Sequence, residues 1–253
     1  MIEIHNLHKK FNNSPVLKGL SLNIDRGQTC VIIGRSGCGK SVLLKHIVGL
    51  LRPEQGKVMV DGKEVAALDE LELDALRSKI SMVFQGGALF DSMNVTENVG
   101  FSLIEHTRIG RQELLERVEE ALGLVGLGGI GSLMPSELSG GMKKRVALAR
   151  AICIRPEIIL YDEPTTGIDP IAADSINGLI RSLHDKLKVT SIVVTHDMKS
   201  AYHIADKIAM MYKGRIIMEG APREFRESKD PVVHQFIHGI AKGPITEAVD
   251  NFK

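Results

Sequence analysis

An eight-residue glycine-rich segment, GRSGCGKS at residues 34–41, constrains the fold of this chain more than any other feature. It follows an apolar run at residues 30–33 and precedes a helical pattern, VLLKHIVGLL. Glycines allow backbone N–H groups to curl around an anion, and a helix that begins there directs its positive end at the same anion. Strand, loop and helix in this order are typical of a phosphate-binding loop, so the sequence predicts a nucleotide-binding α/β domain.

Two residues at the end of this loop carry the predicted chemistry. Lys40 supplies positive charge to the β- and γ-phosphates, and Ser41 supplies a hydroxyl ligand to Mg²⁺. Cys38 is interpreted as a spacer, with sensitivity to thiol reagents as the alternative because a helix N-terminus lowers the pKa of a thiol. The residues predicted to contact the nucleotide here are Gly34, Arg35, Ser36, Gly37, Cys38, Gly39, Lys40, Ser41 and Val42.

A second apolar run, IILYDEP at residues 158–164, ends in two acidic residues. A strand here would place Asp162 at its carboxyl end, the edge where open parallel sheets bind ligands. We expect Asp162 to hold the ligand shell of Mg²⁺, and Glu163 to orient and deprotonate an attacking water. Adjacent carboxylates at a strand end otherwise form a solvated turn, and the phosphate-binding loop favours the catalytic interpretation over that one.

Composition and charge exclude several classes of protein. The 253 residues carry 32 basic and 31 acidic side chains, and this balance argues against nucleic acid as the main partner. The N-terminus lacks the apolar core of a secretory signal, and no stretch approaches the roughly 18 apolar residues of a membrane span. The three cysteines have no CxxC spacing, as expected of thiols in a reducing cytoplasm. Any membrane role is therefore expected to depend on a partner.

Hydrophobic periodicity divides the chain into regions. Alternating patterns at residues 20–24 and 57–61 predict a small antiparallel sheet near the N-terminus. Residues 86–155 contain little strand pattern, so a helical subdomain is predicted there. Within it, residues 111–125 place six apolar side chains, Leu115 among them, on one helical face.

The second half of the chain predicts a parallel sheet. Short apolar runs at residues 157–161, 190–195 and 207–212 are typical of strands, and a helical pattern separates the first two. Lys213 and Gly214 then mark a hairpin.

The tail, residues 226–253, is predicted to be separate from the preceding domain. Asp230 and Pro231 can begin a helix, and apolar residues from Val232 to Ile240 fall on one side of it.

The segment LSGGM, which ends at Met142, resembles the signature of the ABC ATPase family, where glutamine normally occupies this last position. Other motifs of that family follow in its order: Gln85 after a strand, residues 166–169 after the acidic pair, and His196 after another strand. The resemblance covers residues 1–225. It implies an α/β fold, the ABC nucleotide-binding domain, with a P-loop RecA-like parallel core, an antiparallel β subdomain and a helical subdomain.

The resemblance also implies roles for individual residues. Phe11 is expected to stack on the adenine of ATP, with a core or edge aromatic as the alternative. Gln85 would sense Mg²⁺ and the attacking water and link both to a permease, and His196 would contact the γ-phosphate. The implied catalytic residues are Glu163, His196, Gln85 and Lys40, and the implied metal ligands are Ser41, Gln85 and Asp162.

A complete site requires two chains according to the same resemblance. Ser139, Gly140 and Gly141 stand at the start of a predicted helix and form a second anion cradle, which the family geometry places against the ATP of the other subunit. Asp169 would lie at the interface and couple the two sites. Because this chain has one phosphate-binding loop and one signature, we expect a homodimer.

Finer features resemble the MlaF-type phospholipid-trafficking ATPases of the Gram-negative envelope. They are QGGALFDSMNVTENV at residues 85–99, the signature with Met142, and the tail segment DPVVHQFIHGIAKGP. The resemblance implies an MlaE-like integral-membrane permease, an MlaD-like lipid-binding protein and an MlaB-like STAS-domain regulator, with the ATPase on the cytoplasmic face of the inner membrane. It also implies a tail that crosses to the partner ATPase, with packing on its own domain as the alternative.

Other interpretations stay open at this point. Phe90 and Met93 are expected to pack against a permease helix, or else to belong to the core of the helical subdomain. The alternatives for the whole chain are the ATPase of a solute importer, for example of amino acids, and a soluble ABC protein without a transport role.

Overall fold

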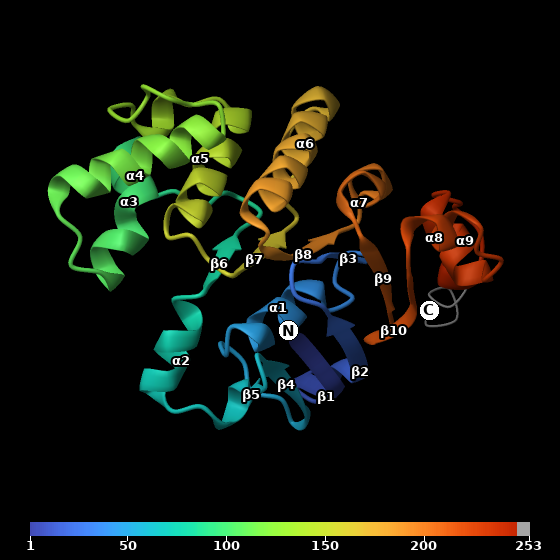
Figure 1. Ribbon diagram of the computed structural model, residues 1–253. Helices are drawn as coiled ribbons and strands as arrows, with labels where there is room; N and C mark the ends of the chain where they lie inside the picture. The colour runs from blue at the N-terminus through green and yellow to red at the C-terminus, as the bar shows by residue number, and fades with distance from the viewer. Residues whose placement is uncertain (247–253) are drawn as a thin grey trace.

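The computed structural model describes residues 1–246, which form two β-sheets and several groups of helices (Figure 1). The larger sheet contains β3 (Thr29–Ile33), β6 (Ile80–Val83), β7 (Ile158–Asp162), β8 (Thr190–Thr195), β9 (Lys207–Tyr212) and β10 (Arg215–Gly220). Their order across the sheet is β10-β9-β3-β8-β7-β6, and the edge strand β10 runs antiparallel to β9 while the other pairs are parallel. The predicted parallel core and terminal hairpin are therefore confirmed.

The central strands divide the core into two parts. Every residue of β3 and β8 is buried, as is typical of parallel strands covered on both faces. Successive side chains of a strand point to opposite faces, so Cys30 and Ile32 pack toward the smaller sheet, whereas Val31 and Ile33 pack with the later helices. The helices that flank the larger sheet are α1 (Lys40–Ile47), α6 (Pro170–Leu187) and α7 (Met198–Ile204).

The smaller sheet is antiparallel, with the order β2-β1-β4-β5. It consists of β1 (Ile2–Phe11), β2 (Ser14–Ile24), β4 (Gln55–Val60) and β5 (Lys63–Glu64). The alternating patterns predicted β2 and β4 but not β1, and a bulge explains the omission. The register of β1 shifts between Ile4 and Leu7, and Asn6 between them has a φ of 48°. This bulge interrupts the alternation of apolar residues by which a strand is recognised.

The helices of the helical subdomain lie between residues 95 and 153 (green to yellow in Figure 1), and the bounds of the subdomain itself stay a prediction. It contains α3 (Val95–His106), α4 (Arg111–Leu124), the 3₁₀ turn η2 (Pro135–Glu137) and α5 (Gly140–Cys153), and the short η1 (Val65–Ala67) and α2 (Glu70–Arg77) precede it. The expectation that Leu115 belongs to the apolar face of α4 is wrong. Leu115 is 42% exposed, because the buried face of α4 is the narrower stripe of Val118, Ala121 and Leu122.

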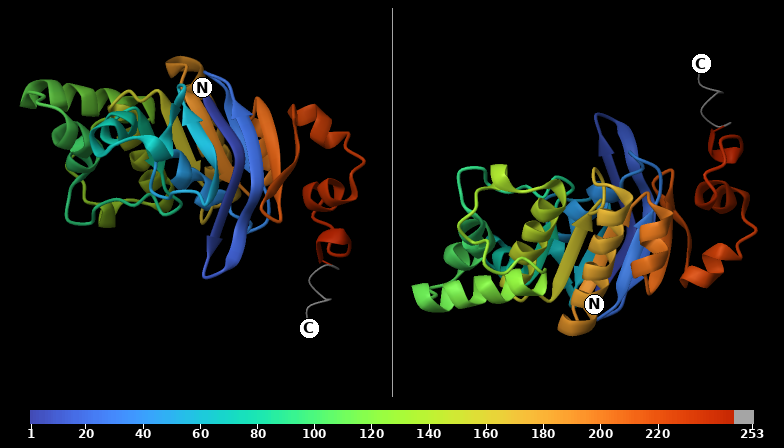
Figure 2. Two further views of the ribbon diagram at one scale, coloured as in Figure 1. Left: turned by 90° about the horizontal axis from the view of Figure 1, so that it is seen from below. Right: turned by 90° about the horizontal axis from the view of Figure 1, so that it is seen from above.

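The described part of the tail folds against its own chain. It includes α9 (Pro231–Ile237), which lies with the preceding α8 (Pro222–Arg226) beyond β10 and away from the helical subdomain (Figure 2). Phe225, Val233 and Ile245 are buried in the main hydrophobic core. The helix ends before Ile240, which is 42% exposed, so the predicted apolar face is shorter than expected. Crossing of the tail to a partner subunit stays a prediction.

Within residues 1–246, none of the helices combines the length and the apolar character needed to cross a membrane.

The hairpin between β9 and β10 joins the two sheets. The carbonyl of Gly214 accepts a hydrogen bond from the Lys18 N–H at 2.9 Å, and Arg215 Nε donates to the Lys18 carbonyl at 2.9 Å. Gly214 has a φ of 78°, and a Cβ atom there would collide with the carbonyl oxygen of Val16. Backbone contact at this point therefore requires glycine.

Gly62 offers a matched control for this contact, because its φ is 76° and nothing lies within 4 Å of an added Cβ. We expect Gly62→Ala to lower the free energy of unfolding by about 1 kcal/mol through left-handed strain alone. Gly214→Ala should lower it by ~3 kcal/mol, because the methyl group also displaces the β2 backbone. Urea unfolding followed by circular dichroism measures the free energy of unfolding of both variants. Equal losses of stability would contradict the proposal that close backbone contact at Gly214 joins the two sheets.

Candidate nucleotide site

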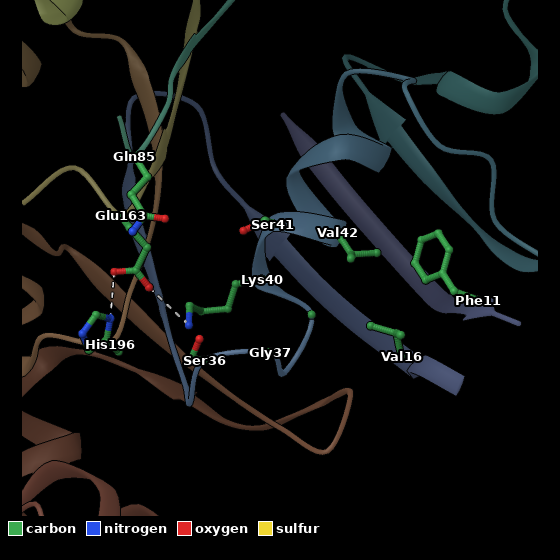
Figure 3. Close-up of a pocket in the computed structure, with 11 residues that line it drawn as sticks. Phe11, Val16, Ser36, Gly37, Lys40, Ser41, Val42, Gln85, Glu163 and His196 are labelled. Atoms are coloured by element: carbon green, nitrogen blue, oxygen red, sulfur yellow. Dashed lines mark hydrogen bonds and ion pairs between the residues drawn. The ribbon is translucent and has the colours of Figure 1, made fainter. Parts of the chain in front are cut away.

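A cavity of about 330 Å³ lies where the phosphate-binding loop meets the carboxyl ends of the parallel strands. Eleven residues line it: Phe11, Val16, Ser36, Gly37, Gly39, Lys40, Ser41, Val42, Gln85, Glu163 and His196. Figure 3 shows Phe11 and Val16 at one end and Glu163 and His196 at the other. The fold thus brings together residues from all three thirds of the chain.

The phosphate-binding loop has the shape of an anion cradle. Helix α1 begins at Lys40 after Gly39, which has a φ of 112°, and in the described chain no side chain caps this helix. Its first N–H groups are therefore available to a phosphate. Gly34 must be glycine because a Cβ atom would collide with the carbonyl of Met211. The donor geometry of the loop fits a nucleotide phosphate chain.

Lys40 is held within the loop that precedes it. Its side chain is 6% exposed, and its Nζ donates to the carbonyls of Gly34 at 2.8 Å and Arg35 at 3.3 Å. Backbone carbonyls compensate for burial of the charge, so the ammonium is kept at the cavity wall. Gly34 and Arg35 act through these carbonyls and are absent from the lining of the cavity.

One carboxylate connects this lysine to the histidine after β8. Glu163 Oε1 lies 3.4 Å from Lys40 Nζ, and Glu163 Oε2 lies 2.9 Å from His196 Nδ1. The Glu163 side chain is 13% exposed, whereas the His196 side chain is 56% exposed. Thr166 Oγ1 also donates to Glu163 Oε2, at 3.2 Å. The carboxylate is thus held at the end of the cavity opposite Phe11, in a position where it could accept a proton from a bound water.

The predicted metal ligands include a close pair of oxygens. Ser41 Oγ donates to Asp162 Oδ1 at 2.9 Å. Burial raises the pKa of Asp162, although the Ser41 hydrogen bond opposes this shift. A hydroxyl and a carboxylate are hard oxygen donors of the kind that Mg²⁺ prefers, and a cation would offset the cost of the buried charge. The donor set therefore fits the predicted ion.

The other end of the cavity is apolar. Phe11 ends β1 with 41% of its surface exposed, and Lys9 Nζ lies 5.5 Å from its ring centroid. Val16 on the neighbouring strand lines the same end, and sequence reasoning missed it. Its position in the β1–β2 hairpin, next to the predicted Phe11, is the only signal that could have identified it. An aromatic face with an aliphatic neighbour is suited to a planar base.

Eight predicted residues are absent from the lining of this cavity: Gly34, Arg35, Cys38 and Asp162, which lie in or beside the phosphate-binding region, and Ser139, Gly140, Gly141 and Asp169, which belong to the signature and to the start of α6. Ser139 caps α5, where its Oγ accepts the Met142 N–H at 3.3 Å, and Asp169 caps α6. A Cβ atom added to Gly140 would lie 3.8 Å from Ile168, so the signature stands beside residues 166–169. Ser139, Gly140 and Asp169 are exposed and Gly141 is partly buried, so these residues lie at the surface of the chain. Completion of the site by another subunit stays a prediction.

The structure argues against the alternative role of Cys38, which is sensitivity to thiol reagents. Burial raises the pKa of the Cys38 thiol, and the nearby Lys40 charge only partly opposes that shift. A thiol with a raised pKa contains less of the reactive thiolate. The helix N-terminus is therefore outweighed by desolvation, and the spacer interpretation is the one that the structure supports.

Comparison with known proteins identifies the class. The sequence profile of the ABC transporter family matches residues 17–166. The dimeric post-hydrolysis state of the ATP-binding cassette MJ0796, bound to ADP and phosphate, superimposes with a TM-score of 0.80 at 34% identity, over 88% of this chain and 99% of that one. This chain therefore belongs to the ABC transporter family and is an ATP-hydrolysing cassette.

Two curated relatives narrow the comparison further. The chain is 42% identical to the intermembrane phospholipid transport system ATP-binding protein MlaF of Haemophilus influenzae, over 97% of this chain and 93% of the relative. It is 44% identical to the chloroplast protein TRIGALACTOSYLDIACYLGLYCEROL 3 of Arabidopsis thaliana, over 97% of this chain and 75% of the relative. The MlaF resemblance noted in the sequence is thereby confirmed.

The half-buried carboxyl of Asp162 generates a prediction about stability. Its folded-state pKa is raised, so its ionisation weakens the fold as pH rises above the ordinary carboxyl range near 4. Without nucleotide, Asp162→Asn should raise the free energy of unfolding by about 0.5 kcal/mol near pH 7.5, a figure reduced by solvent screening, and by less near pH 5.

With Mg²⁺ and ATP the variant should instead be less stable than the parent. It lacks the carboxylate ligand, so binding of Mg-ATP raises its free energy of unfolding by less. Urea unfolding at both pH values, with and without Mg-ATP, tests the sign. If the variant is less stable than the parent near pH 7.5 without nucleotide, ionisation of Asp162 does not destabilise the fold as we propose.

Proposed function

We propose that this chain is the ATPase subunit of a transporter that moves phospholipids between the membranes of a Gram-negative envelope. The observation that carries the proposal is the similarity to MlaF, which extends over nearly the whole of both chains. A second candidate is supported by 41% identity to the probable ribonucleotide transport ATP-binding protein mkl of Mycobacterium tuberculosis, of which 68% is covered. The greater coverage favours the phospholipid system.

In the proposed mechanism, the residues of the cavity act by positioning and by neutralising charge. Lys40 and the loop N–H groups bind the phosphates, and Phe11 stacks on the base. Glu163 takes a proton from the water while the water oxygen bonds to the γ-phosphorus and the bond from that phosphorus to the departing ADP oxygen breaks, with His196 and Gln85 beside it. Mg²⁺, held by Ser41 and Asp162, would supply positive charge at the phosphate oxygens.

We propose that the site is completed by a second copy of this chain. Ser139, Gly140 and Gly141 would then face the nucleotide of the partner subunit, and Asp169 would lie between the two sites. The separation of the signature from the cavity within one chain, together with the dimeric MJ0796 cassette, supports this arrangement.

We propose that a groove of about 350 Å³ is the docking site for a helix of an MlaE-like permease. The ATPase would then lie on the cytoplasmic face of the inner membrane. Phe84, Phe90 and Phe101 line the groove, and the ring centroids of Phe90 and Phe101 lie 4.7 Å apart. The amide of buried Asn98 holds Phe90 in place through its backbone N–H and carbonyl, at 2.8 and 3.0 Å. Met93, the other residue expected to contact the permease, is absent from the lining.

The remaining proposed partners rest on the resemblance alone. They are an MlaD-like lipid-binding protein and an MlaB-like STAS-domain regulator. The tail is proposed to cross to the partner ATPase, and part of it, residues 247–253, lies outside the described residues.

The catalytic assignment predicts a large effect of Glu163→Gln on turnover. We expect kcat for ATP to fall by about 10²–10⁴-fold while ATP still binds, because the variant keeps the shape of the site and loses the base. Glu157→Gln is the matched control, since it removes a half-exposed carboxylate at the other end of β7. Steady-state phosphate release measures both, and normal turnover by Glu163→Gln would refute the assignment.

The cargo can be tested with the same variant. We expect Glu163→Gln, purified by affinity from native membranes with ATP, to carry an MlaE-like permease, an MlaD-like protein and enriched phospholipid, as identified by mass spectrometry. Lys40→Ala, which should lack bound ATP, provides the control. A solute-importer permease without lipid enrichment would refute the phospholipid proposal.

A further inference from the structure

Helix α5 directs two cationic side chains at one loop, residues 85–88, which follows β6. Lys144 Nζ donates to the carbonyl of Gln85. Arg150 donates from Nη1 to the carbonyl of Ala88 at 2.7 Å and from Nη2 to the carbonyl of Gly87 at 2.6 Å. Three of the four carbonyls of the loop are therefore bound by the helix that begins at the signature.

Burial of these cations has a cost that the loop must offset. Lys144 is 7% exposed, and burial lowers the pKa of both Lys144 and Arg150. Within residues 1–246 neither side chain forms an ion pair with a carboxylate, so backbone carbonyls are their main compensation. Charged donors bound to carbonyls form strong hydrogen bonds. These hydrogen bonds therefore fix residues 85–88 to α5.

The loop itself requires external support. Gly87 has a φ of 76°, and Ala88, which is not a glycine, has a φ of 47°. A left-handed alanine costs about 1–2 kcal/mol, and it persists only where its surroundings hold it. The forked guanidinium of Arg150 spans the two carbonyls at this turn, a geometry that the point charge of a lysine cannot reproduce.

The same loop connects the two sites already described. Gln85 lines the nucleotide cavity, whereas Ala88 and Arg150 line the aromatic groove. Lys144 also lies close enough to Glu163 for that carboxylate to oppose the fall in its pKa. The cavity, the groove and the signature helix thus share one set of contacts.

We propose that Lys144 and Arg150 are positioning residues that clamp Gln85 to the signature helix, so that a change in the nucleotide cavity moves the aromatic groove and the reverse. The inference rests on the proposed function, because it assumes that ATP binds in the cavity. It adds the two side chains through which binding and hydrolysis reach the groove.

The chain contains no tryptophan, so Phe90→Trp provides a single fluorescent reporter in the groove. In the full-length Glu163→Gln chain with this reporter, Mg-ATP should shift the emission. Addition of Lys144→Met or Arg150→Lys should reduce that shift at least threefold, while the Kd for radiolabelled ATP stays within twofold. Arg155→Gln is the control, because Arg155 follows α5 and pairs with Glu120 on an exposed surface.

Hydrolysis gives an independent readout in the chain with its native Glu163. Lys144→Met and Arg150→Lys should each lower kcat about tenfold with little change in KM, the size expected for loss of one charged hydrogen bond. Lys144→Arg should recover part of the loss because it keeps a charged donor. If Lys144→Met fails to fold, as judged by circular dichroism, Lys144→Gln replaces it.

Distinct outcomes separate the two proposals. A reference chain that binds no ATP would overturn the proposed function and this inference with it. A reference chain that binds ATP without a change in emission would overturn the inference alone, as would an undiminished shift in the clamp variants. Equal losses of kcat in Arg150→Lys and Arg155→Gln would show that the contacts of Arg150 with the loop are merely structural. That result would also overturn the inference.

Discussion

The site depends on one packing constraint: the central strands are buried on both faces, so charged residues stand only where the strands end. The register pairs Ile33 with Thr195 and Asp162 with Val194, which brings the ends of β3, β7 and β8 level. The phosphate-binding loop, the acidic pair and the histidine each follow one of these ends. Hydrogen bonding between buried strands thus sets the distances within the site.

The price of this arrangement is a concentration of charge in a poorly solvated place. Lys40 and Lys144 are almost fully buried, and the side chain of Glu163 is 13% exposed. Backbone carbonyls and a single shared carboxylate compensate for the cations. Groups held in this way are suited to the proton transfer and phosphate binding that we propose, whereas ordinary surface ion pairs contribute little to either stability or geometry.

Helix α5 connects the two surfaces at which we propose that partners bind. Its start carries the signature, which lies away from the cavity of its own chain, and its later turns hold the loop between cavity and groove. A second subunit and a helix in the groove would therefore act on the same rigid element. This provides a physical route by which ATP hydrolysis could be coupled to movement in another protein.

The sequence by itself determined the phosphate-binding loop, the strand that presents Asp162, the alternation of strands and helices that forms the parallel sheet, and the helical subdomain. Each of these features depends on residues close together in the chain, through glycine torsion angles, hydrophobic periodicity and helix caps. The sequence did not reveal β1, whose bulge at Asn6 breaks the periodic signal, or the exposure of Leu115. Only the tertiary structure decided that Val16 joins the cavity and that burial outweighs the helix N-terminus at Cys38. These outcomes depend on contacts and solvent exclusion between residues far apart in the chain, which no local pattern encodes.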